Sequence, residues 1–283
     1  MRVLHRRLGQ TRVQTAEIVP LKFTLKMQAT LTVLGSGTSM GVPTIGCDCA
    51  VCHSSDPRDR RTRPSIMISY SGRHVLIDTT PDFREQALRE HITQLDAVFY
   101  THTHADHILG IDDLRPLTYH HKPGKMPLYA TPRNCDFLRN MFRYIFEANY
   151  KFGGLPQVEL RPIEAPVEVF GATFDPVTVI HGETPILGYR FGSAAYLTDH
   201  SAVPPESLEK LRDLDILFLD ALRYKPHPTH SSVEQSLEIV AAVKPKLAFF
   251  THICHDLPHE ETNGKLPPNV KLAYDGMKLE FEI

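Results

Sequence analysis

The sequence lacks a run of about 18 apolar residues, so we predict no transmembrane helix. It also lacks a strong charge balance: the net charge of −2 offers no whole-chain argument for binding nucleic acid or an acidic membrane surface. No basic stripe interleaved with aromatic residues is present, which argues against a nucleic-acid-binding protein. We therefore expect a cytoplasmic protein.

The first 26 residues lack the continuous apolar segment of a secretory signal. Arginines and lysines accompany a single acid there, Glu17. A basic segment of this kind suits a transit peptide or a nucleic-acid-binding arm, but we expect a disordered extension, or a true start at Met27. Residues 27–283 are then predicted to form one domain, with the hydrophobic content (42%) and charged content (23%) of an ordinary globular enzyme.

Cysteine is scarce, and three of the five cysteines lie within six residues: Cys47, Cys49 and Cys52. This C-x-C-x-x-C spacing suits a metal site better than a disulfide framework. A tetrahedral structural zinc needs a fourth ligand. His53 is too close to Cys52 to supply it, so we expect a distant histidine. Three reduced buried thiols are the alternative. Cys135 is expected to be buried as a small hydrophobic residue in a helix over 131–144.

Histidine, by contrast, is abundant, with 16 residues. Four metal-capable side chains follow an apolar run at 95–100 that predicts a buried strand: His102, His104, Asp106 and His107. In extended backbone, His102 and His104 point to the same side, and the turn into the next helix adds the other two. One such stretch can serve two neighbouring metals of the Zn, Mn or Fe type. A polar surface loop is the alternative reading.

Further potential ligands follow the ends of later predicted strands. We predict strands at 173–180, 194–198, 214–219 and 246–251. They are followed by His181, by Asp199 and His200, by Asp220 and by His252. Side chains at successive strand ends meet at one edge of a sheet, so we expect a central metal site there.

The remaining elements include a strand at 30–34, a hairpin of strands 65–70 and 73–78, and helices over 82–90 and 109–119. Asp112, Asp113 and Arg115 in the last helix either orient the histidines or act as caps and ion pairs. The arginines of a charged loop either meet a phosphate-bearing substrate or pair with neighbouring acids. These arginines are Arg58, Arg60, Arg61 and Arg63.

From about residue 28 to the C-terminus, the sequence resembles the metallo-β-lactamase superfamily. The residues that match its five metal motifs in order are His102, His104, Asp106, His107, His181, Asp199 and His252. Within it, the chain looks most like the cyclic-phosphate phosphodiesterase family of the carbon–phosphorus lyase pathway. The features behind this closer match are Gly35–Ser39 with Gly41–Pro43, the three clustered cysteines with His255, and Thr229–Ser232 with Glu234. The last of these resembles a motif of tRNA 3′-processing enzymes, whose long exosite arm is not evident.

This resemblance implies a four-layer αββα sandwich of the α/β class. It implies one metal on His102, His104 and His181, and a second on Asp106, His107 and His252. Asp199 bridges the two. The metals, Zn or Mn, share a bridging hydroxide that attacks phosphorus.

The resemblance also implies roles outside the metal ligands. His230 is expected to act as general acid, with Glu234 orienting it or facing solvent, and with His200 as a weaker candidate donor. His255 is expected to complete a structural zinc site with the cysteines. Cys254 is expected to pack outside this site. A homodimer is expected by analogy.

The expected activity is a phosphodiesterase acting on small cyclic or nucleotide-like phosphodiesters. A metallo-hydrolase of another bond, such as a lactone or thioester, and a nucleic-acid processing nuclease are the alternatives, because fold does not determine substrate.

Overall fold

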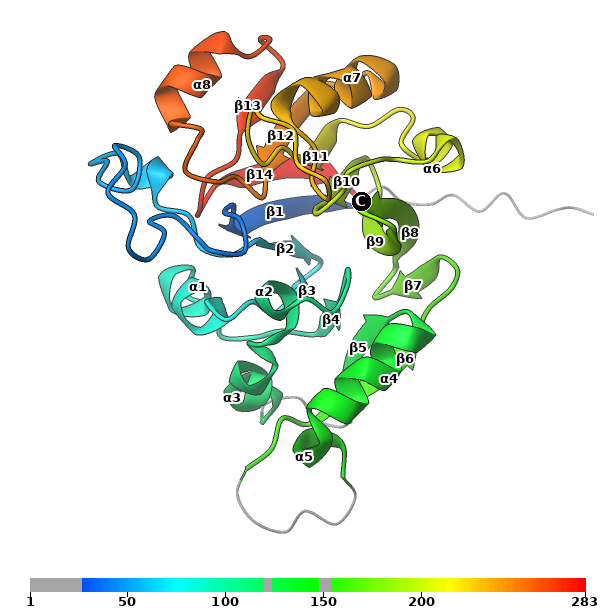
Figure 1. Ribbon diagram of the computed structural model, residues 1–283. Helices are drawn as coiled ribbons and strands as arrows, with labels where there is room; N and C mark the ends of the chain where they lie inside the picture. Colours follow the sequence, from blue (N-terminus) through cyan, green and yellow to red (C-terminus); the bar gives the residue numbers. More distant parts are fainter. Residues whose placement is uncertain (1–26, 120–123, 148–153) are drawn as a thin grey trace, which may run out of the picture.

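The computed structural model describes residues 27–119, 124–147 and 154–283; the expectations for residues 1–26 lie outside these ranges. Two seven-stranded β-sheets lie face to face, and helices cover their outer faces (Figure 1). The predicted four-layer αββα sandwich is confirmed. Within the described residues, no helix combines the length and apolar character needed to cross a membrane.

The first sheet has the strand order β14-β1-β2-β3-β4-β5-β6. Its strands are β1 (Gln28–Gly35), β2 (Ser65–Tyr70), β3 (Arg73–Ile77), β4 (Ala97–Phe99), β5 (Met126–Ala130), β6 (Val158–Pro162) and β14 (Lys278–Glu282). The predicted hairpin is confirmed, with β2 and β3 antiparallel around Ser71 and Gly72. The strands from β3 to β6 pair in parallel, so β4 is buried on both faces and reads as a continuous apolar run.

The second sheet has the order β13-β12-β11-β10-β9-β8-β7. Its strands are β7 (Val167–Val169), β8 (Ala172–His181), β9 (Thr184–Phe191), β10 (Ala194–Leu197), β11 (Ile216–Asp220), β12 (Leu247–Thr251) and β13 (Val270–Leu272). All four strands predicted in this part of the chain are present, as β8, β10, β11 and β12. Because β10 to β13 are parallel, the ends of β10, β11 and β12 lie at one edge.

The helices are short and form the outer layers. They are α1 (Phe83–Arg89), α2 (Ala105–Ile108), α3 (Arg115–Thr118), α4 (Pro132–Met141), α5 (Arg143–Phe146), α6 (Pro205–Lys210), α7 (Val233–Val243) and α8 (His259–Lys265). Two 3₁₀ turns, η1 (Pro57–Asp59) and η2 (Ile111–Leu114), accompany them. α7 begins with a capping box, in which Ser232 and Gln235 satisfy each other's backbone amides.

Two helix predictions are wrong in detail. The segment 109–119 is not one helix but η2 followed by α3, because Pro116 has no backbone donor for a continuous helix. Gly110 precedes η2 and packs so closely on Thr80 that a side chain would meet the Thr80 carbonyl oxygen. The predicted helix 131–144 divides into α4 and α5, and Cys135 in α4 is buried as expected.

The interior between the sheets is filled by side chains from both of them. Phe99 of β4 stacks on Tyr129 and on Phe174, at 4.6 Å between ring centroids in each case, and meets Tyr189 edge-on at 5.1 Å. Tyr129 belongs to the first sheet, whereas Phe174 and Tyr189 belong to the second. This apolar layer holds the two sheets together and thereby determines how their edges meet.

Candidate metal centre

Both sheets deliver metal-capable side chains to one edge of the sandwich. His102 and His104 follow β4, and Asp106 and His107 lie in the first turn of α2. His181 ends β8, while Asp199 and His252 lie just beyond β10 and β12. Asp199 and His252 have φ values of 57° and 56°. Left-handed backbone is uncommon in residues other than glycine, and here it turns both side chains into the site.

These side chains form two clusters, and within each cluster the ligand atoms lie within 4.8 Å of one another. We call them the His cluster, made of His102, His104 and His181, and the Asp–His cluster, made of Asp106, His107, Asp199 and His252. The two sets are those named from the sequence. Asp199 also lies close to the His cluster, with Oδ1 4.0 Å from His102 Nε2.

The polar atoms of the clusters lie close together, but their geometry does not make hydrogen bonds to the Nε2 atoms. His107 Nε2 lies 3.2 Å from both Asp106 Oδ2 and Asp199 Oδ2, and His252 Nε2 lies 3.1 Å from Asp199 Oδ1. Nevertheless, the buried Nε2 atoms of His102, His107 and His252 have no hydrogen-bond partner among the described residues. A buried polar atom without a partner costs about 1–3 kcal/mol. Divalent cations would satisfy all three nitrogens, so the donor set fits metal binding.

Charge balance supports the same conclusion. Burial alone would lower the pKa of His252, but Asp199 and Asp106 raise it to about 10. In His107, too, the neighbouring carboxylates overcome burial and raise the pKa. The carboxylates therefore stabilise positive charge at this point, which protons or divalent cations can supply.

His107 and His181 each use the Nδ1 atom for a hydrogen bond, which leaves Nε2 free for the site. His107 Nδ1 lies 2.7 Å from Asp78 Oδ2, and His181 Nδ1 lies 2.7 Å from the carbonyl oxygen of Thr229. Asp78 is fully buried and also accepts hydrogen bonds from the backbone amide and hydroxyl of Thr101. Such outer contacts determine tautomer and ring direction.

Of the two alternatives left open for Asp112 and Asp113, the contacts do not support an orienting role. Asp112 accepts a hydrogen bond from the hydroxyl of Tyr144 at 3.0 Å, and the residue bound to His107 is Asp78. The sequence holds a signal for Asp78, because this residue ends a predicted strand, 73–78, as the metal-capable residues end or follow others.

His230 lies between the two clusters. Its ring stacks on His252 at 4.5 Å with an interplanar angle of 13°, and it meets His181 edge-on at 4.8 Å. His230 Nδ1 lies 2.6 Å from Asp220 Oδ2 at the end of β11. Of the two alternatives for Glu234, the structure supports the one in which it faces solvent, because it is exposed on α7. Asp220 orients His230 instead.

The weaker candidate donor, His200, is enclosed. Its ring is fully buried, its Nδ1 lies 3.0 Å from Ser231 Oγ, and burial lowers its pKa to about 3. A histidine without solvent access that stays neutral is poorly placed to protonate a leaving group. His200 instead supports the loop that carries His230, because its carbonyl oxygen accepts the amide of Ser231.

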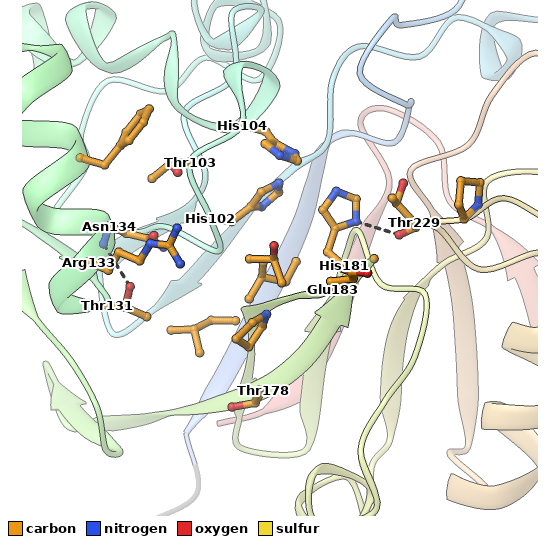
Figure 2. Close-up of a pocket in the computed structure, with 17 residues that line it drawn as sticks. His102, Thr103, His104, Thr131, Arg133, Asn134, Thr178, His181, Glu183 and Thr229 are labelled. Carbon is orange, nitrogen blue, oxygen red and sulfur yellow. Dashed lines mark hydrogen bonds between the residues drawn. The ribbon is translucent and has the colours of Figure 1, made fainter.

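A pocket of about 1130 Å³ opens beside the His cluster (Figure 2). Its walls come from the first residues of α4, from the turn between β8 and β9, and from the loop at Pro228 and Thr229. His102, His104 and His181 line one part of it. The pocket is large enough to receive a nucleotide-sized molecule.

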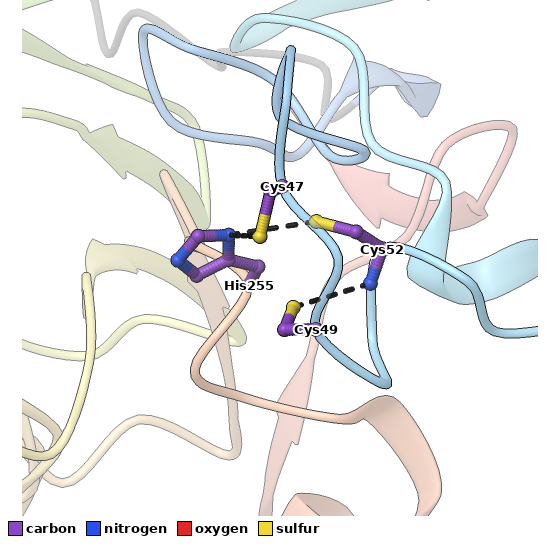
Figure 3. A group of neighbouring side chains, drawn as sticks. All are labelled: Cys47, Cys49, Cys52 and His255. Atoms are coloured by element: carbon purple, nitrogen blue, oxygen red, sulfur yellow. Dashed lines mark hydrogen bonds between the residues drawn. The ribbon is translucent and has the colours of Figure 1, made fainter.

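The cysteine cluster forms a second site away from the pocket (Figure 3). Cys47, Cys49, Cys52 and His255 place their ligand atoms within 4.8 Å of one another. His255 Nδ1 lies 3.4 Å from Cys47 Sγ and 3.5 Å from Cys52 Sγ. His53 is exposed and faces Asp48 at 3.6 Å, and the histidine that lies beside the three sulfurs is the distant His255. Three sulfurs and one nitrogen fit a tetrahedral zinc.

The arginines of the charged loop face acids and carbonyl groups. Arg61 is fully buried and donates to Asp59 and to the carbonyl oxygens of Cys254 and Leu257. Arg58 pairs with Asp56 and Glu260, and Arg63 with Asp82. The structure therefore favours ion pairing over substrate binding for these three arginines.

Comparison with known proteins defines the family. The model of the β-lactamase superfamily domain matches residues 73–253. The chain belongs to the metallo-β-lactamase superfamily, it has the fold of a metallo-β-lactamase hydrolase, and that fold implies divalent metals. The crystal structure of a new diphosphatase from the PhnP family is 61% identical, with a TM-score of 0.87, over 92% of this chain and 99% of that one. Within the superfamily, the chain lies near the PhnP family.

Curated relatives extend the comparison. An octanoyltransferase of Porphyromonas gingivalis is 40% identical over 87% of this chain and 50% of its own length. A ribonuclease Z of Bradyrhizobium diazoefficiens is 27% identical over 50% of this chain and 48% of its own length. The chain thus spans about half the length of these two relatives.

Proposed function

We propose that the protein is a dinuclear metal-dependent phosphodiesterase acting on small cyclic or nucleotide-like phosphodiesters. The observation that carries this proposal is the Asp220–His230 pair, which lies against both metal-capable clusters but belongs to neither of them as defined above. His230 is 12% exposed at the side chain, whereas Asp220 is fully buried. An alkoxide leaving group needs a proton, and a histidine held in this way can supply it.

Each of the two clusters would hold one metal. His102, His104 and His181 would hold one metal; Asp106, His107 and His252 would hold the second; Asp199 lies between them. Zinc or manganese suits these nitrogen and oxygen donors. When bound, two such cations lower the pKa of a water molecule and neutralise charge on the phosphoryl oxygens.

The residues of the chain position the proton that the leaving group receives. The buried carboxylate of Asp220 accepts the hydrogen bond from His230 Nδ1, so the other ring nitrogen, Nε2, is left to face the substrate. The stacking contact with His252 keeps the ring in one plane. His230 Nε2 then donates its proton to the oxygen that leaves phosphorus, and Asp220 stabilises the orientation in which this happens.

Leaving-group dependence tests this role. In the manganese- or zinc-loaded protein, His230→Ala should reduce kcat for a diester with an alkoxide leaving group by about 10²- to 10⁴-fold. It should reduce kcat far less for bis(p-nitrophenyl) phosphate, because p-nitrophenolate leaves without a proton. Steady-state kinetics with both substrates on the same preparations provide the measurement.

A matched variant controls for a general loss of structure. His227→Ala removes a neighbouring ring, 5.1 Å from His230 between centroids, that has no assigned role. It should leave the ratio of the two activities near that of the wild type. Equal losses on both substrates in His230→Ala, with metal content intact, would contradict the general-acid role. Absence of diester hydrolysis by the wild type would contradict the proposed activity.

Two further substrates decide between reaction classes. The relative named diphosphatase supports hydrolysis at phosphorus, so a diphosphate diester such as ADP-ribose belongs in the screen. The relative named octanoyltransferase makes an octanoyl thioester the appropriate probe for acyl chemistry. Preferential turnover of the thioester would replace the phosphodiesterase proposal with a thioesterase.

A further inference from the structure

Three buried polar atoms beside the Asp–His cluster are not used by the proposed chemistry. They are Asp220 Oδ1, Thr251 Oγ1 and His252 Nδ1, and none of them has a hydrogen-bond partner among the described residues. Asp220 and Thr251 are fully buried and His252 is 1% exposed, so bulk solvent does not reach these atoms. Because an unpaired buried polar atom is costly, a shared hydrogen-bond partner is favoured at this point.

The second sheet brings the three side chains together. Asp220 and Thr251 are paired residues of the parallel strands β11 and β12, so their side chains project from the same face of the sheet. His252 follows Thr251 directly, beyond the end of β12. The ligand atoms of Asp220, His230 and His252 lie within 4.8 Å of one another. The carboxylate of Asp220 is therefore a neighbour of both histidine rings.

Asp220 contacts the two rings in different ways. Its Oδ2 atom lies 2.6 Å from His230 Nδ1, which is a direct hydrogen bond. Among the described residues, the carboxylates that pair with His252 are Asp106 and Asp199, and no hydrogen bond joins this ring to Asp220. Two polar groups that one water molecule bridges lie about 4–5 Å apart, which suits the spacing of Asp220 and His252. A buried water makes about three hydrogen bonds to otherwise unpaired groups, and three such atoms are present.

We propose that Asp220, Thr251 and His252 bind one buried water molecule, and that Asp220 positions the ring of His252 through it. His252 Nδ1 donates to the water, the water donates to Asp220 Oδ1, and the Thr251 hydroxyl completes its contacts. Asp220 is then a positioning residue for two histidines, and it holds the proton donor and a metal-capable ring in the stacked arrangement described above. The inference rests on the proposed function only for the metal-binding role of His252.

Zinc affinity, measured by competition with a chromophoric chelator, tests the positioning role. Asp220→Asn should weaken zinc binding at the Asp–His cluster by about 10- to 100-fold, because the amide offers one acceptor where two are needed. Thr251→Val removes a partner of the water without changing charge, and it should weaken binding by about 10-fold. Thr262→Val is the matched control, because Thr262 in α8 is also a buried threonine with an unpaired hydroxyl, and it should bind zinc like the wild type.

Wild-type affinity in Thr251→Val overturns the positioning role, because a loss confined to Asp220→Asn is an effect of charge. Equal losses in Thr251→Val and Thr262→Val overturn it as well. A crystal structure of the wild type, at a resolution that shows ordered water, tests the site without zinc binding or activity. One water within about 3.2 Å of all three atoms is expected, and its absence overturns the proposal. If the wild type binds no zinc beyond the cysteine cluster, the proposed function fails, and the crystal structure alone decides whether the water site exists.

Discussion

At the scale of single residues, two buried carboxylates control how histidines face the site. Asp78 orients His107, and Asp220 orients His230. Both carboxylates are fully buried, and burial raises the pKa of each while the histidine partner opposes that effect. Each acts through a ring nitrogen and contacts neither cluster centre itself. Substituting them should change the metal content or the proton transfer without removing a ligand.

Asp78→Asn should weaken the binding of catalytic metal by about 10- to 100-fold, the usual effect of losing an outer hydrogen bond to a ligand histidine. The amide cannot accept the hydrogen bonds from His107 and Thr101 as the carboxylate does. Competition with a chromophoric chelator measures the affinity. Asp112→Asn is the matched control, because Asp112 contacts Tyr144 instead, and it should retain normal affinity. Equal affinities in the two variants would contradict this role of Asp78.

At the scale of elements, the cysteine loop is fastened to the segment that carries His252. His255 approaches Cys47 and Cys52, and the buried guanidinium of Arg61 donates to the carbonyl oxygens of Cys254 and Leu257 at 3.0 and 2.7 Å. The backbone amide of Ile253 also donates to the carbonyl oxygen of Ser36. The loop after β1 therefore supports the residues directly beyond β12.

We expect Cys49→Ser to abolish zinc binding at the cysteine cluster, lower the Tm and reduce the metal content of the His and Asp–His clusters. The physical reason is that the closed site contributes folding free energy to the segment that positions His252. Elemental analysis after gel filtration, with a thermal melt, measures both effects. His53→Gln alters the exposed histidine beside Cys52 and should match the wild type in both. Full catalytic metal content and an unchanged Tm in Cys49→Ser would refute this coupling.

At the scale of the whole molecule, the site depends on how the two sheets pack. The His cluster takes His102 and His104 from the first sheet and His181 from the second. The Asp–His cluster likewise combines α2 with the ends of β10 and β12. The aromatic contacts around Phe99 hold the sheets together just before the residues that begin the site.

Phe99→Ala should lower the free energy of unfolding by about 3–5 kcal/mol, because it leaves a cavity between the sheets. Urea denaturation of the metal-loaded protein measures the loss. Leu88→Ala in α1 removes a side chain that is 60% exposed and should change stability by no more than about 0.5 kcal/mol. A comparably small effect of Phe99→Ala would show that this contact does not hold the sheets together.

Much of this arrangement follows from local patterns. The apolar runs predict the strands that become β4, β8, β10, β11 and β12, and the polar residues directly after them are the ones that meet. Cysteine spacing alone predicts a second metal site, because three thiolates within six residues have few other uses. Gly110 and Pro116 are residue types that break helices, and they mark where the helical spacing over 109–119 does not become one helix.

The sequence by itself determined which residue types lie at strand ends, and hence that metal-capable side chains gather at one edge. The tertiary structure decided which carboxylates orient them. Asp78 and Asp220, and not Asp112 and Glu234, contact the histidine rings. The orientation of a ring depends on which carboxylate lies close to it and is buried with it, and spacing along the sequence does not specify these distances.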